Sequence, residues 1–195
     1  MAASIATIVE GHGEVKALPV LLRRLQGVAE FNGYLDIQSP IRIPADAFFD
    51  SKKLSRALQI AIADREERHL VLLLRDADDD CPVELAKNIL SFVGEIDKVE
   101  VLVVVAKCEY ESWFVASAPS LAGKRGLPDD LSVPANHHSI RGAKEWLSSR
   151  MGQRRSYGET VDQPALSELM DLGMACQNPS FRRFHDRVLA FLRGG

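Results

Sequence analysis

Three short apolar runs dominate the hydrophobic pattern, at residues 4–9, 69–74 and 99–106. Unbroken runs of Ile, Val and Leu of this length are typical of parallel strands that are buried on both faces of a sheet. A further extended segment is predicted at residues 34–43, where three isoleucines are separated by polar residues and a proline. We therefore expect a sheet of about four strands.

Apolar residues at helical spacing lie between these runs. A leucine-rich stripe predicts a helix at residues 14–28, and a second helix is expected from a cap at Asp50 or Ser51 to residue 68. A third is expected to open after Asp80, with Pro82 at an early helical position, and to end near residue 96. Alternating strands and helices predict an α/β fold with a mostly parallel sheet flanked by helices.

The pattern changes after Ser117. Residues 119–142 are rich in Gly and Pro and are expected to form a long irregular connection. Helices are then predicted at residues 143–151, 164–176 and 181–192, the last with an apolar stripe that favours packing against the sheet. We expect an α/β core over residues 1–118, followed by a connection and C-terminal helices over residues 119–195.

Composition excludes several classes of protein. The chain has 195 residues, of which 46% are hydrophobic and 26% charged, as in an ordinary globular protein. No stretch approaches the roughly 20 apolar residues that span a bilayer, and the N-terminus lacks the basic region of a signal peptide, so we expect a cytoplasmic protein with no membrane partner. Three widely spaced cysteines, with no CxxC spacing, support neither a zinc ribbon nor a thioredoxin-like motif.

Charge is distributed unevenly along the chain. The net charge is −3, but the part from Arg141 onward has nine Lys and Arg residues against six Asp and Glu residues. An acidic core beside a mildly basic C-terminal part is compatible with a metal site next to a phosphate-contacting surface, and equally with random scatter.

The first candidate motif is VEGHGE, directly after the first apolar run. A strand followed by two glycines suggests a dinucleotide site, but Lys16 stands where a third glycine is needed, and Glu10 would repel a pyrophosphate. The remaining functional interpretation places Glu10 at the strand end and Glu14 on the first helical turn. The alternative is a turn whose acidic residues only stabilise the start of a helix.

The second candidate motif is RDADDD, after the second long run. Asp76 and Asp78 alternate, so on an extended strand end their side chains would face the same side and bind one cation or two. Asp80 is a possible additional ligand or a helix cap. Carboxylates that converge at the carboxyl edge of a parallel sheet repel one another unless a cation is present. Oxygen-only ligands suit Mg²⁺ or Mn²⁺, and we predict such an ion at Glu10, Asp76 and Asp78.

The third candidate motif is KCEYESWF, after the third run. Glu109 and Glu111 are possible additional site residues, and Lys107 would supply a positive charge to a phosphate or a leaving oxygen. The alternative is a pair of helix-start glutamates beside a surface lysine. Candidate nucleic-acid contacts lie in two pairs of arginines, which otherwise are only solvated: Arg154, Arg155, Arg182 and Arg183.

The order of these motifs resembles the TOPRIM fold of topoisomerases, bacterial primases and overcoming-lysogenization-defect nucleases, in which a glutamate follows the first strand and a DxD pair follows a later one. Glu10, Asp76 and Asp78 match that pattern, and Glu14 resembles an additional acid of the nuclease branch. A closer resemblance is to the bacterial family called domain of unknown function 4276, which extends the match to YGETVDQ at residues 157–163 and SFRRF at residues 180–184.

The resemblance implies Mg²⁺- or Mn²⁺-dependent phosphoryl transfer on nucleic acid, commonly in genome defence. In such a nuclease, Glu10 or Glu14 would act as a general base, and Lys107 or an arginine would offset charge on the phosphate. The alternative is a non-catalytic TOPRIM-like module that binds a partner protein such as an ATPase. Whether the substrate is DNA or RNA, and the oligomeric state, are left open by the sequence.

Overall fold

The sheet is parallel throughout in the computed structural model, which describes residues 2–63, 68–94, 96, 99–135, 137, 140–152 and 155–194. The strands follow the spatial order β2-β1-β4-β5, and the short β3 also pairs with β1. The predicted α/β sheet is confirmed. Its strands are β1 (Ala2–Val9), β2 (Tyr34–Ile37), β3 (Ile41–Arg42), β4 (His69–Asp76) and β5 (Glu100–Ala106).

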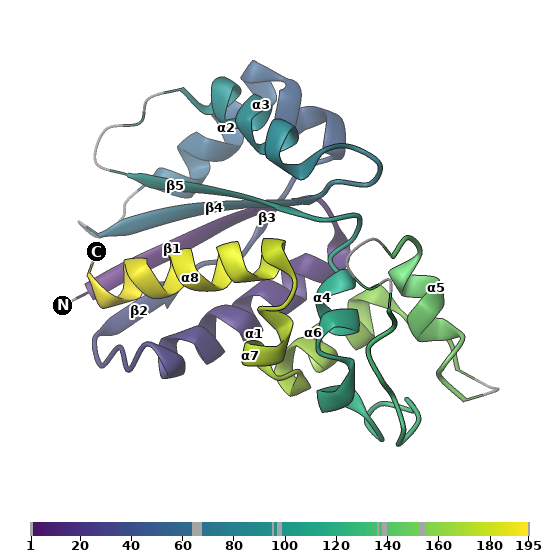
Figure 1. Ribbon diagram of the computed structural model, residues 1–195. Coiled ribbons are helices and arrows are strands. Elements are labelled where there is room, and N and C mark those ends of the chain that lie inside the picture. The colour runs from purple at the N-terminus through teal and green to yellow at the C-terminus, as the bar shows by residue number, and fades with distance from the viewer. Residues whose placement is uncertain are drawn as a thin grey trace.

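Helices cover both faces of the sheet, as Figure 1 shows. Successive residues of a strand point to opposite faces, so Leu70 and Leu72 enter one hydrophobic cluster, while Val71 and Leu73 enter the other. The first cluster packs against α1 (His12–Val28), α6 (Glu159–Leu169) and α8 (Pro179–Arg193). The second packs against η1 (Ala45–Phe49), α2 (Ser51–Ile62) and α3 (Pro82–Val93).

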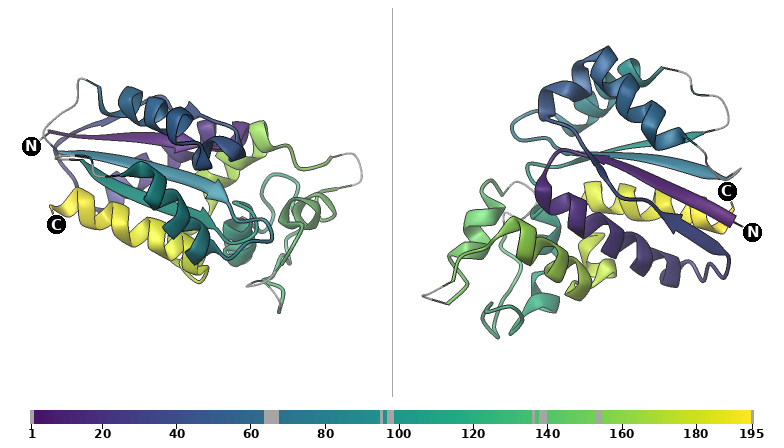
Figure 2. Two further views of the ribbon diagram at one scale, coloured as in Figure 1. Left: turned by 90° about the horizontal axis from the view of Figure 1, so that it is seen from above. Right: turned by 180° about the vertical axis from the view of Figure 1, so that it is seen from behind.

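Short elements gather beyond the carboxyl ends of the strands, as the two views in Figure 2 show, and the ion pair between Lys144 and Glu159 joins α5 to the start of α6. Aromatic packing joins this region to the sheet, because the Trp113 ring lies 5.1 Å from that of Phe181 and 5.6 Å from that of Phe184. The hydrophobic cluster therefore crosses residue 118, and a domain boundary there stays a prediction. The short elements are α4 (Ser112–Ala116), η2 (Ala118–Leu121), α5 (Ala143–Ser148) and α7 (Leu172–Ala175).

Some helix ends differ from the expected positions. Asp50 caps α2 by accepting hydrogen bonds from the N–H groups of Lys52 and Lys53, as predicted, but the helix ends at Ile62 instead of residue 68. Residues 64–67 of the expected helix lie outside the described residues. Helix α3 ends at Val93 because Gly94 follows with a φ of +70°, which glycine adopts without strain.

The expected helix at residues 164–176 is two helices, and the first begins five residues earlier than predicted. Pro164 lies inside α6, where its missing N–H leaves the Thr160 carbonyl without its helical donor. Lys16 of α1 donates to that carbonyl at 3.2 Å, so tertiary packing makes the early proline tolerable. Asp171 then caps α7 through the N–H of Met174, which explains the break between the two helices.

None of the helices that the structure describes combines the length and the apolar character needed to cross a bilayer.

Candidate functional site

Three of the predicted acidic residues meet at the carboxyl edge of the sheet. Glu10 directly follows β1, and Asp76 is the last residue of the adjacent strand β4, which pairs with β1 in register. Glu14 lies on the first turn of α1. Together they line a crevice of about 360 Å³, whose other lining residues are Gly11, Arg42, Pro44, Ala45, Lys144 and Glu159.

Glycine at position 11 leaves space for the carboxylate of Glu14. A Cβ atom on Gly11 would lie 2.0 Å from Glu14 Oε2, a distance that no side chain tolerates. The carboxylate therefore packs against the backbone of the turn between β1 and α1. Glycine at the first position of the pair in VEGHGE is therefore explained by the packing of Glu14, without a bound phosphate.

Asp76 is the most perturbed acid of the crevice. Its Oδ1 atom accepts a hydrogen bond of 2.8 Å from the backbone N–H of Tyr110. Burial raises the pKa of Asp76 well above its ordinary value, and the nearby carboxylates of Glu111 and Glu14 raise it further. Negative charge is therefore costly at this position unless a cation accompanies it.

Glu10 and Glu14 are also held in surroundings that disfavour their charged forms. Burial is the largest cause of a raised pKa for both carboxyl groups. Arg75 opposes this effect at Glu10, with its Nε atom 3.6 Å from Glu10 Oε2. The buried Oε2 atoms of Glu10 and Glu14 nevertheless accept no hydrogen bond, so both carboxylates retain an unused acceptor.

Glu111 lies behind the crevice and is fully buried. The hydroxyl of Tyr157 donates to Glu111 Oε1 at 2.7 Å, while Glu111 Oε2 has no hydrogen-bond partner. Burial raises the pKa of Glu111 to about 7, although Lys144 and the Tyr157 hydroxyl act in the opposite direction. The carboxyl of Glu111 thus changes protonation near neutral pH.

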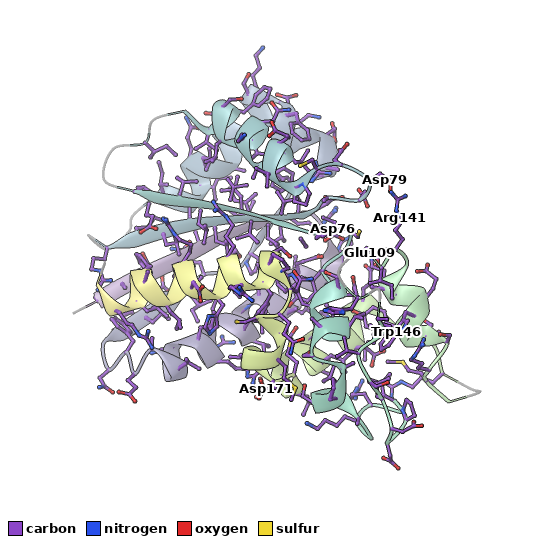
Figure 3. All side chains as sticks on the ribbon, in the orientation of Figure 1. Asp76, Asp79, Glu109, Arg141, Trp146 and Asp171 are labelled. Atoms are coloured by element: carbon purple, nitrogen blue, oxygen red, sulfur yellow. The ribbon has the colours of Figure 1, made fainter. Side chains whose placement is uncertain are left out.

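Lys144 is one of two cations in the described lining of the crevice, with Arg42. Its Nζ atom lies 2.6 Å from Glu159 Oε1, and its backbone N–H donates to Glu109 Oε2 at the start of α5. Burial lowers the pKa of Lys144, but the carboxylates of Glu111 and Glu159 raise it above the ordinary value. Figure 3 shows Glu109 beside Asp76 at this end of the sheet.

Comparison with known proteins places this site in a family. The family described as Domain of unknown function (DUF4276) matches residues 9–189. The chain belongs to this family. A solved structure titled the C-terminal region of the Burkholderia pseudomallei OLD protein shares the fold, with a TM-score of 0.51 and 11% sequence identity, over 96% of this chain and 98% of that chain. No curated protein matches the sequence. The resemblance predicted from the motifs is therefore confirmed at the level of family and fold.

The YGETVDQ segment of this DUF4276 chain brings α6 to the crevice. Glu159 lines the crevice, and the side-chain amide of Gln163 donates to Glu14 Oε1. Asp162 instead stabilises the segment itself, because its carboxylate accepts from the N–H of Gly158 and forms ion pairs with Arg125 and Arg155. The segment both completes the crevice and fixes the start of α6.

Asp78 does not extend the strand as expected. The chain turns after Asp76, and Asp78 has a φ of +49°, in the left-handed region that aspartate adopts more readily than most residues. Its N–H donates to the carbonyl of Cys108, and its side chain is exposed outside the lining of the crevice. Asp78 is still near enough to raise the pKa of Glu10. The expectation that Asp76 and Asp78 face one side of an extended strand is therefore wrong.

Other predicted residues lie elsewhere. Asp80 lines a separate pocket with Phe49 and Glu84, and the residue at the cap position of α3 is Cys81, without a side-chain hydrogen bond. Lys107 and Arg183 line a groove between α3 and α8.

The remaining arginines have contacts of their own. Arg182 donates to the carbonyl of Cys176, and Arg155 pairs with Asp162. Arg154 lies outside the described residues. The lysine that lines the acidic crevice is thus Lys144, and Lys107 lines the groove instead. No local signal in the sequence distinguishes Lys144 from other helical lysines.

The acids fit a hydrated cation better than a fully enclosed one. Among the described residues, no three His, Cys, Asp or Glu side chains lie close enough together to form a ready-made metal site. Mg²⁺ usually keeps several of its waters and binds through one or two carboxylates together with substrate phosphates. The oxygens of Glu10 and Glu14 that accept no hydrogen bond, together with the partly buried Asp76, fit that mode of binding.

Proposed function

We propose that the chain is a divalent-metal-dependent phosphoryl-transfer protein that cleaves phosphodiester bonds in nucleic acid. The observation that supports this most directly is the convergence of Glu10, Glu14 and Asp76 in one crevice, with two buried oxygens that accept no hydrogen bond. The motif order that resembles the overcoming-lysogenization-defect nucleases supports the same reaction class. A role in genome defence stays a prediction.

Asp76, Glu10 and Glu14 would hold Mg²⁺ or Mn²⁺, with Asp78 as a further candidate ligand from the turn after β4. A cation there would polarise a phosphodiester oxygen and lower the pKa of a bound water. Its charge would also offset the mutual repulsion that raises the pKa of Asp76.

The chain's own residues have two further roles in this proposal. Whichever of Glu14 and Glu10 does not bind the cation would accept a proton as general base, and burial, which raises the pKa of both carboxyl groups, makes them more basic than exposed glutamates. Lys144 would contact the phosphate and offset the charge that develops on it. Arg42, which donates to the Glu10 carbonyl from β3, adds a second cation to the lining of the crevice.

A cleavage assay tests the proposal. The protein is incubated with single-stranded and double-stranded DNA and with RNA, each with Mg²⁺, Mn²⁺ or EDTA. Glu10→Gln and Asp76→Asn are compared with Glu84→Gln, a matched control whose carboxylate lies outside the crevice on α3 and is 69% exposed. We expect divalent-dependent cleavage by the parent and the control, and a loss of at least about 100-fold in both crevice variants.

Two results would contradict the proposal. Cleavage that persists in both crevice variants would place the activity at another site or in a contaminant. An absence of cleavage on every substrate, with the fold intact by circular dichroism, would favour the alternative function. That alternative, a non-catalytic module that binds a partner such as an ATPase, stays a prediction.

A further inference from the structure

One edge of the sheet faces a groove that shares no lining residue with the acidic crevice. β5 is the last strand in the spatial order of the described residues, so no described strand covers its outer edge. That edge lies between α3 and α8, in a groove of about 510 Å³. Its apolar lining includes Val83 and Leu90 of α3, which are 61% and 40% exposed, and Val103 and Val105 of β5.

The hydrogen bonds made by backbone groups of β5 show which of these groups face the groove. Ala106 directs its carbonyl toward β4, where it accepts from the N–H of Ala77. Val103 directs its carbonyl the other way, toward Arg183 of α8, and the N–H of Lys107 points toward Ser180. Because these directions alternate along a strand, residues 101, 103 and 105 direct their N–H and C=O groups toward the groove. The Val103 carbonyl already accepts a hydrogen bond from Arg183, which an added strand would displace.

The groove carries positive charge. Three cations, Lys87, Lys107 and Arg183, belong to its described lining, which contains no Asp or Glu. Lys87 pairs with Glu84 on the solvent side of α3, so its charge is partly offset, but the other two have no ion pair among the described residues. An occupant with acidic side chains would therefore be favoured over a basic one.

We propose that this groove binds an extended segment of a partner protein, in which apolar residues alternate with acidic ones and which pairs with β5 as an additional strand. Main-chain hydrogen bonds to the edge would supply affinity, and alternate side chains would reach the apolar lining. A seven-residue strand such as β5 offers a pairing length of roughly 23 Å. The inference is independent of the proposed nuclease activity.

The lining favours a protein segment over a nucleic acid. Proteins that bind single-stranded nucleic acid commonly stack bases on aromatic side chains. The described lining of this groove contains no aromatic residue, and most of its members are aliphatic residues or prolines. An open strand edge also offers donors and acceptors spaced for another polypeptide backbone.

Fluorescence anisotropy with a labelled, capped octapeptide of alternating valine and glutamate tests the proposal. A peptide of alternating valine and lysine keeps the strand pattern and reverses the charge, and a third peptide has proline at two central positions and cannot pair as a strand. We expect the full-length protein to bind the acidic peptide at least about 10-fold more tightly than either control peptide.

Surface variants locate the binding. Val83→Glu and Arg183→Glu should each weaken binding of the acidic peptide about 10-fold. Val161→Glu is the matched control, since Val161 on α6 is 60% exposed but lies outside the groove. Circular dichroism establishes that each variant is folded.

Four results of the binding measurements would overturn the proposal. These are an absence of binding, equal binding of the acidic and basic peptides, equal affinity in the groove variants and the control, and displacement of the peptide by an oligothymidylate. Dimerisation that is lost in Val83→Glu would also overturn it, because the occupant would then be a second copy of the chain.

Discussion

The side-chain amide of Gln163 donates a hydrogen bond to Glu14 Oε1 across 3.4 Å, although the two residues are 149 positions apart in the sequence. This contact joins the first turn of α1 to α6 and orients a crevice carboxylate from outside the β1–β4 edge. The glycine at position 13 allows the two helices to approach this closely, because a Cβ atom there would lie 1.6 Å from Gln163 Oε1.

Gly13→Ala should therefore destabilise the protein, although alanine is ordinarily the better residue in a helix. We expect a loss of about 1–3 kcal/mol in the free energy of unfolding, because Gln163 or the whole of α6 must move to accommodate the methyl group. Gly27→Ala is the matched control near the other end of α1, where a Cβ atom meets nothing within 4 Å. It should be neutral or stabilising by up to about 1 kcal/mol. Equal stability of the two variants in urea denaturation would contradict the prediction.

The fold and the pair Glu10 and Asp76 were predictable from the sequence for a simple physical reason. Each residue follows an apolar run long enough for one buried strand, and parallel strands bring their carboxyl ends to one edge. Glu14 follows from helical geometry one turn later. Local pattern and strand direction therefore suffice to bring these three acids together.

The rest of the site depends on tertiary packing that no local pattern encodes. Lys144 lines the crevice from α5, and Glu109 holds the start of that helix by accepting the N–H of Lys144. Tyr157 reaches Glu111 across 46 residues through the same folded-back segment. Asp78 leaves the expected position because the chain adopts a left-handed conformation there, which alternation along a strand does not predict.

Glu111 should make the stability of the protein depend on pH. Folding raises its pKa from 4.5 to about 7, so between these values the folded protein retains a proton that the unfolded chain has released. The free energy of unfolding should therefore fall as pH rises through this window, by roughly 3 kcal/mol from this group. Denaturation in EDTA from pH 4.5 to 8 measures the slope.

Glu111→Gln should flatten that slope, since the amide keeps the shape of the side chain but does not ionise. Asp76, Glu10 and Glu14, whose pKa values are also raised, should leave a residual slope of the same sign. Glu84→Gln, with an exposed carboxylate, should retain the full slope. If Glu111→Gln retained it as well, the carboxyl of Glu111 would not be the group that titrates.

Divalent cations should stabilise the protein through the same crevice. Binding to the folded state alone contributes about 2.7 kcal/mol when the free ion is at a hundred times its Kd. Thermal unfolding with Mg²⁺ or Mn²⁺ against EDTA measures the effect, at pH 8 where protons compete less with the cation for the carboxylates than at lower pH. Asp76→Asn and Glu14→Gln should lose most of the shift, and Glu84→Gln should keep it. A shift of equal size in Asp76→Asn would place the cation elsewhere.

Lys144 and Lys107 are alternative sources of the cation that contacts the phosphate, and their positions distinguish them. Lys144 lies in the crevice with its charge stabilised by Glu111 and Glu159, whereas Lys107 lines the groove beside β5. Lys144→Met should therefore reduce cleavage by at least about 100-fold relative to the parent, under the conditions in which the parent is active. Lys107→Met should reduce it much less. Cleavage rates at saturating Mg²⁺, with stability measured in parallel, check this prediction. Since methionine retains most of the aliphatic length of lysine, a loss of cleavage confined to Lys144→Met would reflect the missing charge. A larger loss in Lys107→Met would instead indicate that Lys107, which the sequence favoured, contacts the phosphate.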